Sequence, residues 1–201
     1  MSPRARAENQ ALRDASRARL IEAALELFAQ RGYASTPVDA VAREAGVSPG
    51  LLYRHFRSKT DLLRAIFEES MRDVEATFAD ADREPNPARR LAALLRSIAA
   101  HVKARRRFWT LAYGVRMQRD VLEGLDAMLE ASTGQILRTL ERYLRGVGWP
   151  EPEMEAVLLF AQIDGLHQHY VMNHERYPLD AAIDRLIARY TKTRSKKASA
   201  R

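Results

Sequence analysis

The chain has 201 residues, 46% of them apolar and 29% charged, and 33 Lys and Arg residues against 26 Asp and Glu give a formal net charge of +7. This composition excludes a disordered acidic chain and a membrane protein, and the length allows one medium domain or two small ones. The absence of cysteine excludes disulfide scaffolds, cysteine zinc sites, iron–sulfur clusters and cysteine nucleophiles. Met1 to Arg19 are polar and hold no apolar core, so we expect no secretory signal and a soluble, cytoplasmic protein.

The charge is segregated along the chain. Residues 1–60 hold 10 basic and 6 acidic residues, residues 61–184 hold 16 and 20, and residues 185–201 hold 7 and none. Most of the cations are arginine, whose guanidinium is the better planar partner for phosphate. A basic amino-terminal segment joined to a mildly acidic body predicts two tasks, one of them nucleic-acid contact.

Apolar residues recur at spacings of three and four throughout, as in Leu20, Ala24 and Phe28, which predicts an all-α fold of about nine helices. We find no sustained alternation and no hairpin signal that would favour strands. The predicted helices lie near residues 10–31, 37–45, 49–56, 59–82, 87–104, 105–118, 120–145, 152–173 and 178–193.

The most informative segment starts where the first predicted helix ends. Gly32 can terminate that helix, and Thr36 can N-cap a short second helix that accepts Pro37 in its first turn. Gly46 then stands where a tight turn needs positive φ. Two short helices joined through a glycine turn are typical of a helix-turn-helix.

The third helix of this segment divides into two faces. Ser48 can cap it with Pro49 at its first position, and Val47, Leu52 and Phe56 form a stripe that can pack on the first two helices. Small residues at its start let the backbone approach base edges in a major groove, and its amide end favours phosphate. The residues left mostly outward are Pro49, Gly50, Leu51, Tyr53, Arg54 and His55.

Tyr53, His55 and Lys59 can donate to phosphates on either side of the groove, while Ser58 and Asp61 form a capping box for the fourth helix. Other interpretations stay open. Tyr53 and His55 are also suited to half-buried packing, and a helical arginine is often a solvated cation.

This segment resembles the DNA-binding domain of the TetR family of transcriptional repressors over about residues 16–70. The matching elements are Gly32-Tyr33, Thr36 with Val41-Ala42, Ala45-Gly46-Val47-Ser48 and Leu52-Tyr53-x-His55-Phe56-x-Ser58-Lys59. The resemblance implies phosphate contacts from Thr36, Tyr53, His55 and Lys59, and places Ser48, Gly50, Leu51 and Arg54 near bases. It implies a domain at residues 1–58 with a flexible amino-terminal arm and a ligand-binding and dimerisation domain at 59–193. From their composition we expect residues 194–201 to form a basic tail.

In that family the last two helices pair with their copies in a homodimer. A dimer would address two halves of a near-palindromic double-stranded operator, roughly 34–36 Å apart. One predicted helix has a stripe of small and apolar residues, and the other has an apolar stripe, although either stripe alone is also explained by an intrachain core. The residues of these two stripes are Leu158, Ala161, Gly165, His169 and Met172, and then Ile183, Leu186, Ile187 and Tyr190.

Another face of the helix at 152–173 places Asp164 and His167 inside an apolar stripe, which is costly unless they pair or meet a ligand. This pattern indicates a pocket for a small apolar or aromatic effector. The alternative is that Asp164 and His167 pair with each other inside an ordinary core. The predicted lining residues are His101, Phe108, Trp109, Tyr113, Met117, Met128, Phe160, Asp164 and His167.

The sequence therefore predicts a dimeric, sequence-specific repressor that a small molecule releases from its operator, with a ligand-independent or activating regulator as the alternative. An enzyme using Asp164 and His167 is disfavoured because no catalytic or phosphate-binding motif accompanies them. A metal site from Asp164, His167 and His174 lacks the usual ligand motifs, so we predict no cofactor and no metal. A sequence-indifferent basic protein or a membrane-surface binder would explain the basic tail but not the motif.

Overall fold

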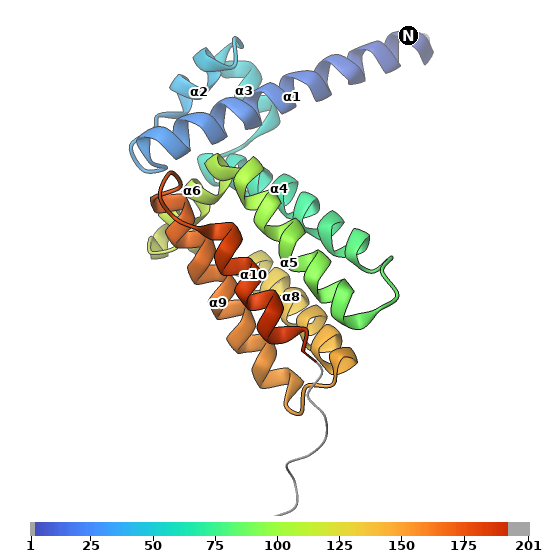
Figure 1. Cartoon of the computed structure of the whole chain (residues 1–201). Coiled ribbons are helices and arrows are strands. Elements are labelled where there is room, and N and C mark those ends of the chain that lie inside the picture. Colours follow the sequence, from blue (N-terminus) through green and yellow to red (C-terminus); the bar gives the residue numbers. More distant parts are fainter. Residues whose placement is uncertain (1–2, 193–201) are drawn as a thin grey trace, which may run out of the picture. The chain divides into compact units, whose positions relative to one another are not determined.

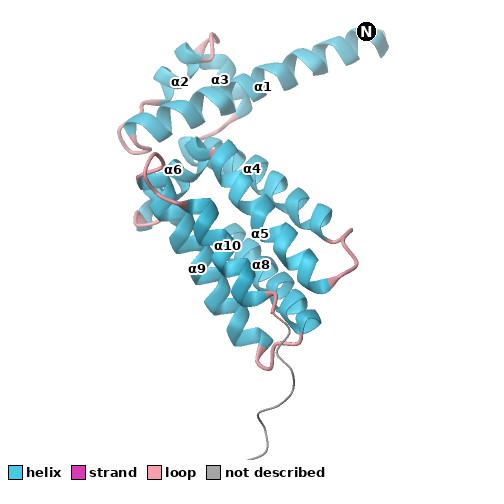
Figure 2. Ribbon diagram, viewed as in Figure 1, coloured by secondary structure: helices cyan, strands magenta, loops and turns pink. Residues whose placement is uncertain are grey.

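The computed structural model describes residues 3–192, with side chains from residue 6 onward. Every regular element in this range is a helix, as the all-α prediction requires (Figure 2). The helices, shown in Figure 1, are α1 (Pro3–Arg31), α2 (Val38–Glu44), α3 (Pro49–His55), α4 (Lys59–Ala81), α5 (Pro87–Ala104), α6 (Arg106–Val115), α7 (Arg119–Leu122), α8 (Asp126–Val147), α9 (Pro152–Met172) and α10 (Leu179–Tyr190).

The described helices form two compact units. Unit 1 is Met1–Ser70 with Arg107–Leu125, and unit 2 is Met71–Arg106 with Asp126–Arg201. The helix α4 therefore contributes its first turns to unit 1 and its remainder to unit 2. The predicted boundary after residue 58 divides the chain elsewhere and stays a prediction, and the predicted basic tail at 194–201 lies outside the described residues.

In unit 1, α1 packs against α2 and α3, and Leu20, Phe28, Val41 and Leu52 are buried between them. Gly32 (φ 86°) ends α1 and Gly46 (φ 65°) makes the turn between α2 and α3, as the sequence predicts. An L side chain at either position would strain the backbone. The two glycine turns thereby fix the orientation of α3 relative to α1 and α2.

The amino-terminal arm is a correction to the sequence prediction. We expected a flexible arm and a first helix from about residue 10, but α1 begins at Pro3. No glycine or second proline interrupts the helix formers before Gly32, so the helix continues although its first turns bury no apolar face. Apolar periodicity, our guide to the start of the helix, is absent there.

The predicted helix at 120–145 is another correction. The structure has a short α7 and a tight turn before α8, in which the Leu125 N–H donates to the Leu122 carbonyl. A Cβ at Gly124 would lie 2.6 Å from the Thr60 methyl carbon, and Arg64 donates to the Gly124 carbonyl at 2.8 Å. This close approach stabilises the turn, so the described range contains ten helices rather than nine.

In unit 2, α5, α8, α9 and α10 enclose one apolar core. Trp149 stacks on Tyr190 with ring centroids 4.9 Å apart and donates to the Tyr190 carbonyl at 3.0 Å. Asp82 accepts two hydrogen bonds from Arg142, at 2.9 and 3.1 Å, and one from the Tyr143 hydroxyl at 2.8 Å. These contacts join the ends of the helices that surround the core.

Candidate nucleic-acid interface and effector region

Helix α3 is built as the sequence predicts. The Ser48 hydroxyl accepts the Leu51 N–H at 3.3 Å, Pro49 occupies the first turn, and Leu52 and Phe56 are buried. The cap satisfies an amide that would otherwise lack an intrahelical partner. Because the buried stripe fixes the rotation of the helix, its other face and its first turn are turned toward solvent.

The outward face of α3 carries most of the residues predicted to meet DNA. Tyr53 is 53% exposed, Arg54 is exposed, and Leu51 is half-buried. Gly50 is exposed, and a Cβ there would have no heavy atom within 4 Å. The first turn of α3 is therefore smooth and open, which suits close approach to another surface.

His55 is half-buried, and its surroundings disfavour the charged form of its ring. Burial lowers the pKa of His55, and the neighbouring charges of Arg17, Arg54 and Arg13 lower it further, while Asp14 raises it. Its Nε2 is buried, and no described residue hydrogen-bonds to it. His55 is therefore a neutral imidazole beside three cations, and the phosphate contact assigned to it stays a prediction.

Lys59 has a structural task that the sequence did not indicate. Its Nζ donates to the Ala34 carbonyl at 3.2 Å and lies 4.5 Å from the Tyr33 ring centroid. Burial lowers its pKa. Lys59 thus ties the start of α4 to the loop after α1, and any phosphate contact would use its remaining N–H donors.

Thr36 is where the predicted role is wrong. Its side chain is fully buried, and its hydroxyl donates to the Gly32 carbonyl at 2.8 Å and lies 3.3 Å from the Leu27 carbonyl oxygen. Pro37, not Thr36, occupies the N-cap position of α2. A buried hydroxyl that is already bonded inside the unit cannot reach a phosphate, so Thr36 secures the end of α1 instead.

The predicted effector residues divide between the units. In unit 1, Phe108 is a core residue packed edge-on against Phe67 at 5.2 Å, and Trp109 lies against Tyr113 at 5.9 Å. Met117 is 89% exposed, the opposite of the enclosed position predicted for it. Phe108 therefore belongs to the core rather than to a pocket wall.

In unit 2, the predicted polar pair is a real electrostatic cluster. His167 is buried on α9, and burial lowers its pKa to about 4, with Asp164 raising it and His101 lowering it. Burial also lowers the pKa of the half-buried His101. Phe160 packs partly against the core and Met128 is half-buried. As one effector site, the nine residues stay a prediction.

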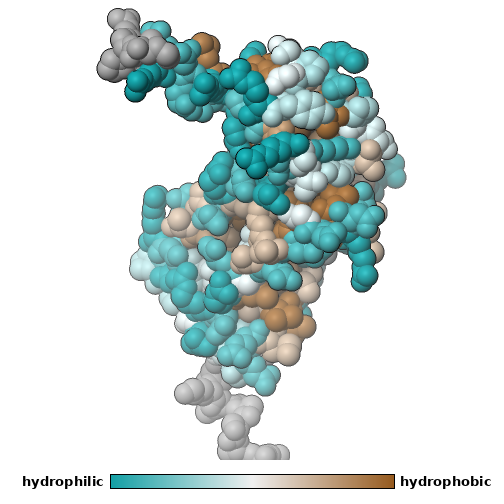
Figure 3. Space-filling model, turned by 180° about the vertical axis from the view of Figure 1, so that it is seen from behind, coloured by the Kyte–Doolittle hydropathy of each residue, from teal (hydrophilic) through white to brown (hydrophobic). Residues whose placement is uncertain are grey.

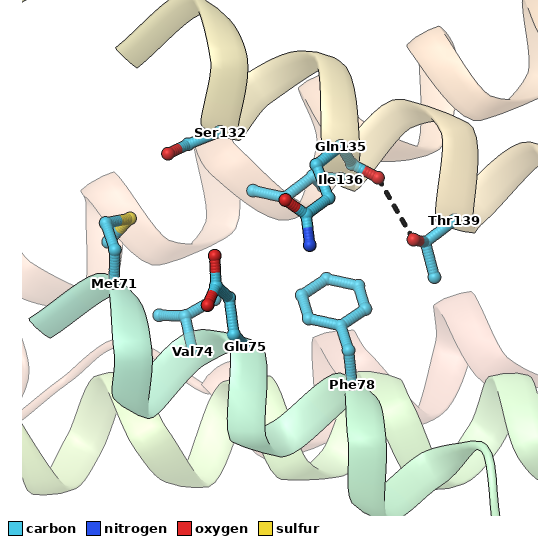
Figure 4. Close-up of a pocket in the computed structure, with 8 residues that line it drawn as sticks. All are labelled: Met71, Val74, Glu75, Phe78, Ser132, Gln135, Ile136 and Thr139. Atoms are coloured by element: carbon cyan, nitrogen blue, oxygen red, sulfur yellow. Dashed lines mark hydrogen bonds between the residues drawn. The ribbon is translucent and has the colours of Figure 1, made fainter. Parts of the chain in front are cut away.

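A cleft that the sequence did not indicate lies between α4 and α8 within unit 2 (Figure 4). Its apolar walls are Met71, Val74 and Phe78 of α4 and Ile136 of α8, while Glu75 and Gln135 extend polar groups into the gap. It is lined also by Ser132 and Thr139. The enclosed space of about 20 Å³ admits roughly one water molecule, far below the hundreds of Å³ of a drug-sized site.

The stripe predicted on α9 is largely exposed. Leu158 is 45% exposed, Met172 is 74% exposed, Ala161 and His169 are exposed, and an added Cβ at Gly165 would have no heavy atom within 4 Å. Met154 and Val157 are exposed as well. Unit 2 therefore leaves one apolar side of α9 uncovered.

The residues predicted on α10 require a correction. Ile183, Leu186, Ile187 and Tyr190 are all buried in the core of unit 2, where they face α5 and α9. They cannot also present a free apolar surface to a second copy. A helical stripe looks the same in sequence whether it meets its own chain or another, which is why the pattern did not separate the two cases.

Within residues 3–192, no helix is both long and apolar enough to cross a membrane. The same part of the chain holds no group of three His, Asp or Glu side chains arranged to bind a metal ion.

Residues 20–66, which contain the capped α3 and its glycine turn, match the family model described as bacterial regulatory proteins, tetR family. The chain belongs to the TetR family. Two relatives extend the likeness over most of the chain, and both are named as regulators rather than enzymes. The fatty acid metabolism regulator protein of Bacillus subtilis is 27% identical over 81% of this chain and 87% of its own, and the HTH-type transcriptional regulator TtgR of Pseudomonas putida is 28% identical over 78% and 80%.

Solved structures agree with a TetR-family fold. A transcriptional regulator from Rhodococcus sp. RHA1 aligns with a TM-score of 0.76 at 27% identity, covering 87% of this chain and 95% of that one. FadR from Bacillus subtilis, solved with stearoyl-CoA, aligns with a TM-score of 0.73 at 21% identity, covering 88% and 98%. The chain is thus a TetR-family transcriptional regulator with a helix-turn-helix DNA-binding domain, and the enzyme alternative falls away.

Proposed function

We propose that this TetR-family regulator is a homodimeric repressor that binds a near-palindromic operator in the cytoplasm and leaves it when a small apolar molecule binds unit 2. The observation that carries the proposal is the open first turn of α3, from Ser48 to Leu51, within the family match. Tyr53 and Arg54 flank this turn on the exposed face. The open turn allows a close approach to base edges, and Tyr53 and Arg54 supply hydrogen-bond donors for the phosphates beside them.

The uncovered side of α9 supports the dimer. Met154, Leu158 and Met172 are large apolar side chains exposed on one helix, with Ala161 and Gly165 between them. Small residues between larger ones allow two helices to approach closely. A second copy related by a twofold axis would cover this face with the same face of its own.

The effector part of the proposal rests on unit 2. Its buried His167 with Asp164 supplies polar groups in an apolar surrounding, and the cleft between α4 and α8 opens onto apolar walls. The cleft is closed to all but a water-sized molecule, so an effector would have to separate these helices. Since α4 contributes residues to both units, its displacement would carry the signal to the helices that hold α3.

The class of effector is suggested by the relatives. The Bacillus subtilis relative is named a fatty acid metabolism regulator, and a neighbour in fold was solved with stearoyl-CoA. A long acyl thioester is therefore the first probe, and other apolar or aromatic compounds follow.

The experiment is a selection of genomic fragments with the purified full-length chain, followed by competition binding between the selected duplex and random duplex at several salt concentrations. We expect a near-palindromic site with a preference of about 10³ or more over random sequence. Equal affinity for both duplexes would overturn the proposal. Release of the duplex by stearoyl-CoA would support an acyl thioester as the effector. An unchanged affinity would exclude acyl thioesters as effectors. An affinity insensitive to every apolar probe would favour the ligand-independent alternative.

A further inference from the structure

The amino-terminal half of α1 extends past α2 and α3 with no other helix of unit 1 beside it (Figure 1). Every side chain described from residue 6 to residue 15 is exposed. An isolated stretch of helix buries nothing that would stabilise it, so packing gives no reason for its presence. Figure 3 shows that this projecting segment, next to the amino terminus, has a mainly hydrophilic surface.

One face of the projecting helix is a line of arginines. Arg6, Arg13 and Arg17 are separated by seven and four residues, which places all three within about 40° of one another around a helix of 3.6 residues per turn. Leu20 and Ala24 continue the same line and are buried against the rest of unit 1. The arginine stripe therefore lies on the side of α1 that turns toward α2 and α3.

The stripe meets the end of α3. The Arg17 guanidinium carbon lies 5.4 Å from the ring centroid of Phe56, the residue that follows α3. Arg13, Arg17 and Arg54 all act on His55 as nearby positive charges. One acidic group lies near this cluster, Asp14, whose carboxylate accepts a hydrogen bond from Gln10 at 2.9 Å.

From this arrangement we propose that the arginine stripe of α1, formed by Arg6, Arg13 and Arg17, is a second DNA-binding surface that contacts the phosphate backbone beyond the half-site read by α3. This inference rests on the proposed function. Phosphate is the partner that the chemistry favours, because guanidinium groups bind phosphate oxygens through paired N–H donors. Contact between Arg17 and Phe56 holds one of these groups at the edge of α3, so the surface continues from the recognition helix onto α1.

The length of the arginine stripe determines how many phosphates of a DNA strand it can contact. Residues 6 to 17 span roughly 16 Å at 1.5 Å per residue, and a DNA strand advances 3.4 Å per phosphate. The stripe thus reaches across about five phosphates. It would lengthen the protected site at each end and add affinity that does not depend on sequence.

The test compares the full-length double variant Arg6→Gln, Arg13→Gln with Arg19→Gln. Glutamine keeps helix propensity, Arg17 is left in place because it contacts Phe56, and Arg19 is an exposed arginine on the opposite face of the same helix. The measurements are the affinity for the selected duplex across a salt series and the affinity for a duplex trimmed to the two half-sites.

We expect the double variant to lose at least about tenfold in affinity at low salt, and its slope of log K against log salt to become shallower by about 0.9 for each phosphate contact removed. It should also gain nothing from the flanking base pairs, while Arg19→Gln stays close to wild type. The inference is overturned if the double variant keeps the slope and the flank dependence of Arg19→Gln.

Failure of the proposed function is distinguishable from failure of this inference. The phosphate contacts are indifferent to sequence, so the double variant should lose affinity for random duplex as well. A wild-type chain with no preference for any duplex would contradict the repressor, yet the same salt slopes would still decide the role of the stripe.

Discussion

Thr36 shows how one side chain can satisfy a family pattern for a reason other than the expected one. Its place ahead of α2 predicted a cap and, by resemblance, a phosphate contact, but the hydroxyl is buried and bonded to the Gly32 carbonyl. Ahead of a proline, the residue is held in extended backbone, and its short side chain turns back to the end of α1. The pattern marks a position in the fold rather than a contact with DNA.

This assignment predicts that Thr36→Val changes the stability of the chain but not its DNA binding. The variant removes the donor to the part-buried Gly32 carbonyl, so the free energy of unfolding should fall by about 1 kcal/mol. The salt slope of DNA binding should not change. Denaturant titration and a binding series measure the two effects, with Thr36→Ser as the matched control that retains the hydroxyl. A Thr36→Val variant with full stability and a shallower slope would restore the phosphate role.

His167 makes the stability of the chain depend on pH. Its pKa is lowered to about 4 because burial disfavours the charged ring. In the unfolded chain the ring takes up a proton below about pH 6.5, so the free energy of unfolding should fall as the pH drops from that value toward 4. At pH 5 the loss from this residue is about 2 kcal/mol.

Thermal or denaturant unfolding at pH 7 and pH 5 measures this effect. His167→Gln should be less sensitive to the change of pH than wild type, while His169→Gln, an exposed histidine on the same helix, should behave as wild type does. Equal pH sensitivity in all three proteins would show that His167 is not held neutral.

At the scale of the element, the sequence predicted well those helices whose ends carry a local signal. Ser48 and Pro49 start α3, Gly46 makes the turn before it, and Ser58 accepts the Asp61 N–H at 3.0 Å at the start of α4. These contacts involve neighbours in the chain, so residue types alone indicate them. The first turns of α1 have no apolar face, so apolar periodicity does not reveal them. The break before α8 depends on a contact with Thr60, which periodicity does not reveal either.

The same limit applies to the faces of α9 and α10. Both stripes are apolar at helical spacing, but Leu158 is exposed and Ile183 is buried in the core. Their difference comes from which side of each helix the other helices of unit 2 cover, and that is a property of tertiary packing. The cleft between α4 and α8 was missed because its residues come from two segments far apart in the sequence.

The exposed side of α9 gives a prediction for assembly. Leu158→Arg would place a charge where the proposed dimer buries an apolar side chain, so the chain should become monomeric at micromolar concentration with an unchanged helical circular dichroism spectrum. Met117→Arg, which makes the same kind of change at an exposed methionine in unit 1, is the control. Sedimentation velocity measures the result, and a dimeric Leu158→Arg variant would remove this face from the interface.

At the scale of the whole molecule, the net charge of +7 is a poor guide to function, because it combines a basic segment at residues 1–60, a mildly acidic body at 61–184 and a basic end at 185–201. In the proposed function these parts take part in one sequence of events: α3 would read DNA, α9 would join two copies, and an effector in unit 2 would shift the population away from the binding state. Each step belongs to different residues, so each can be removed without the others. The whole account nevertheless depends on α3 being the surface that meets DNA.

Whether α3 meets DNA is decided by the affinity of Gly50→Leu for the selected duplex, compared with the stability of the same variant and with the affinity of Gly114→Leu. Both glycines lie in helices of unit 1 with no heavy atom within 4 Å of an added Cβ, so both variants should fold at least as stably as wild type. We predict that Gly50→Leu loses about tenfold or more in affinity for the selected duplex, because its side chain fills the space that base edges would occupy, while Gly114→Leu binds as wild type does. A stable Gly50→Leu variant that binds the selected duplex with wild-type affinity would contradict the account.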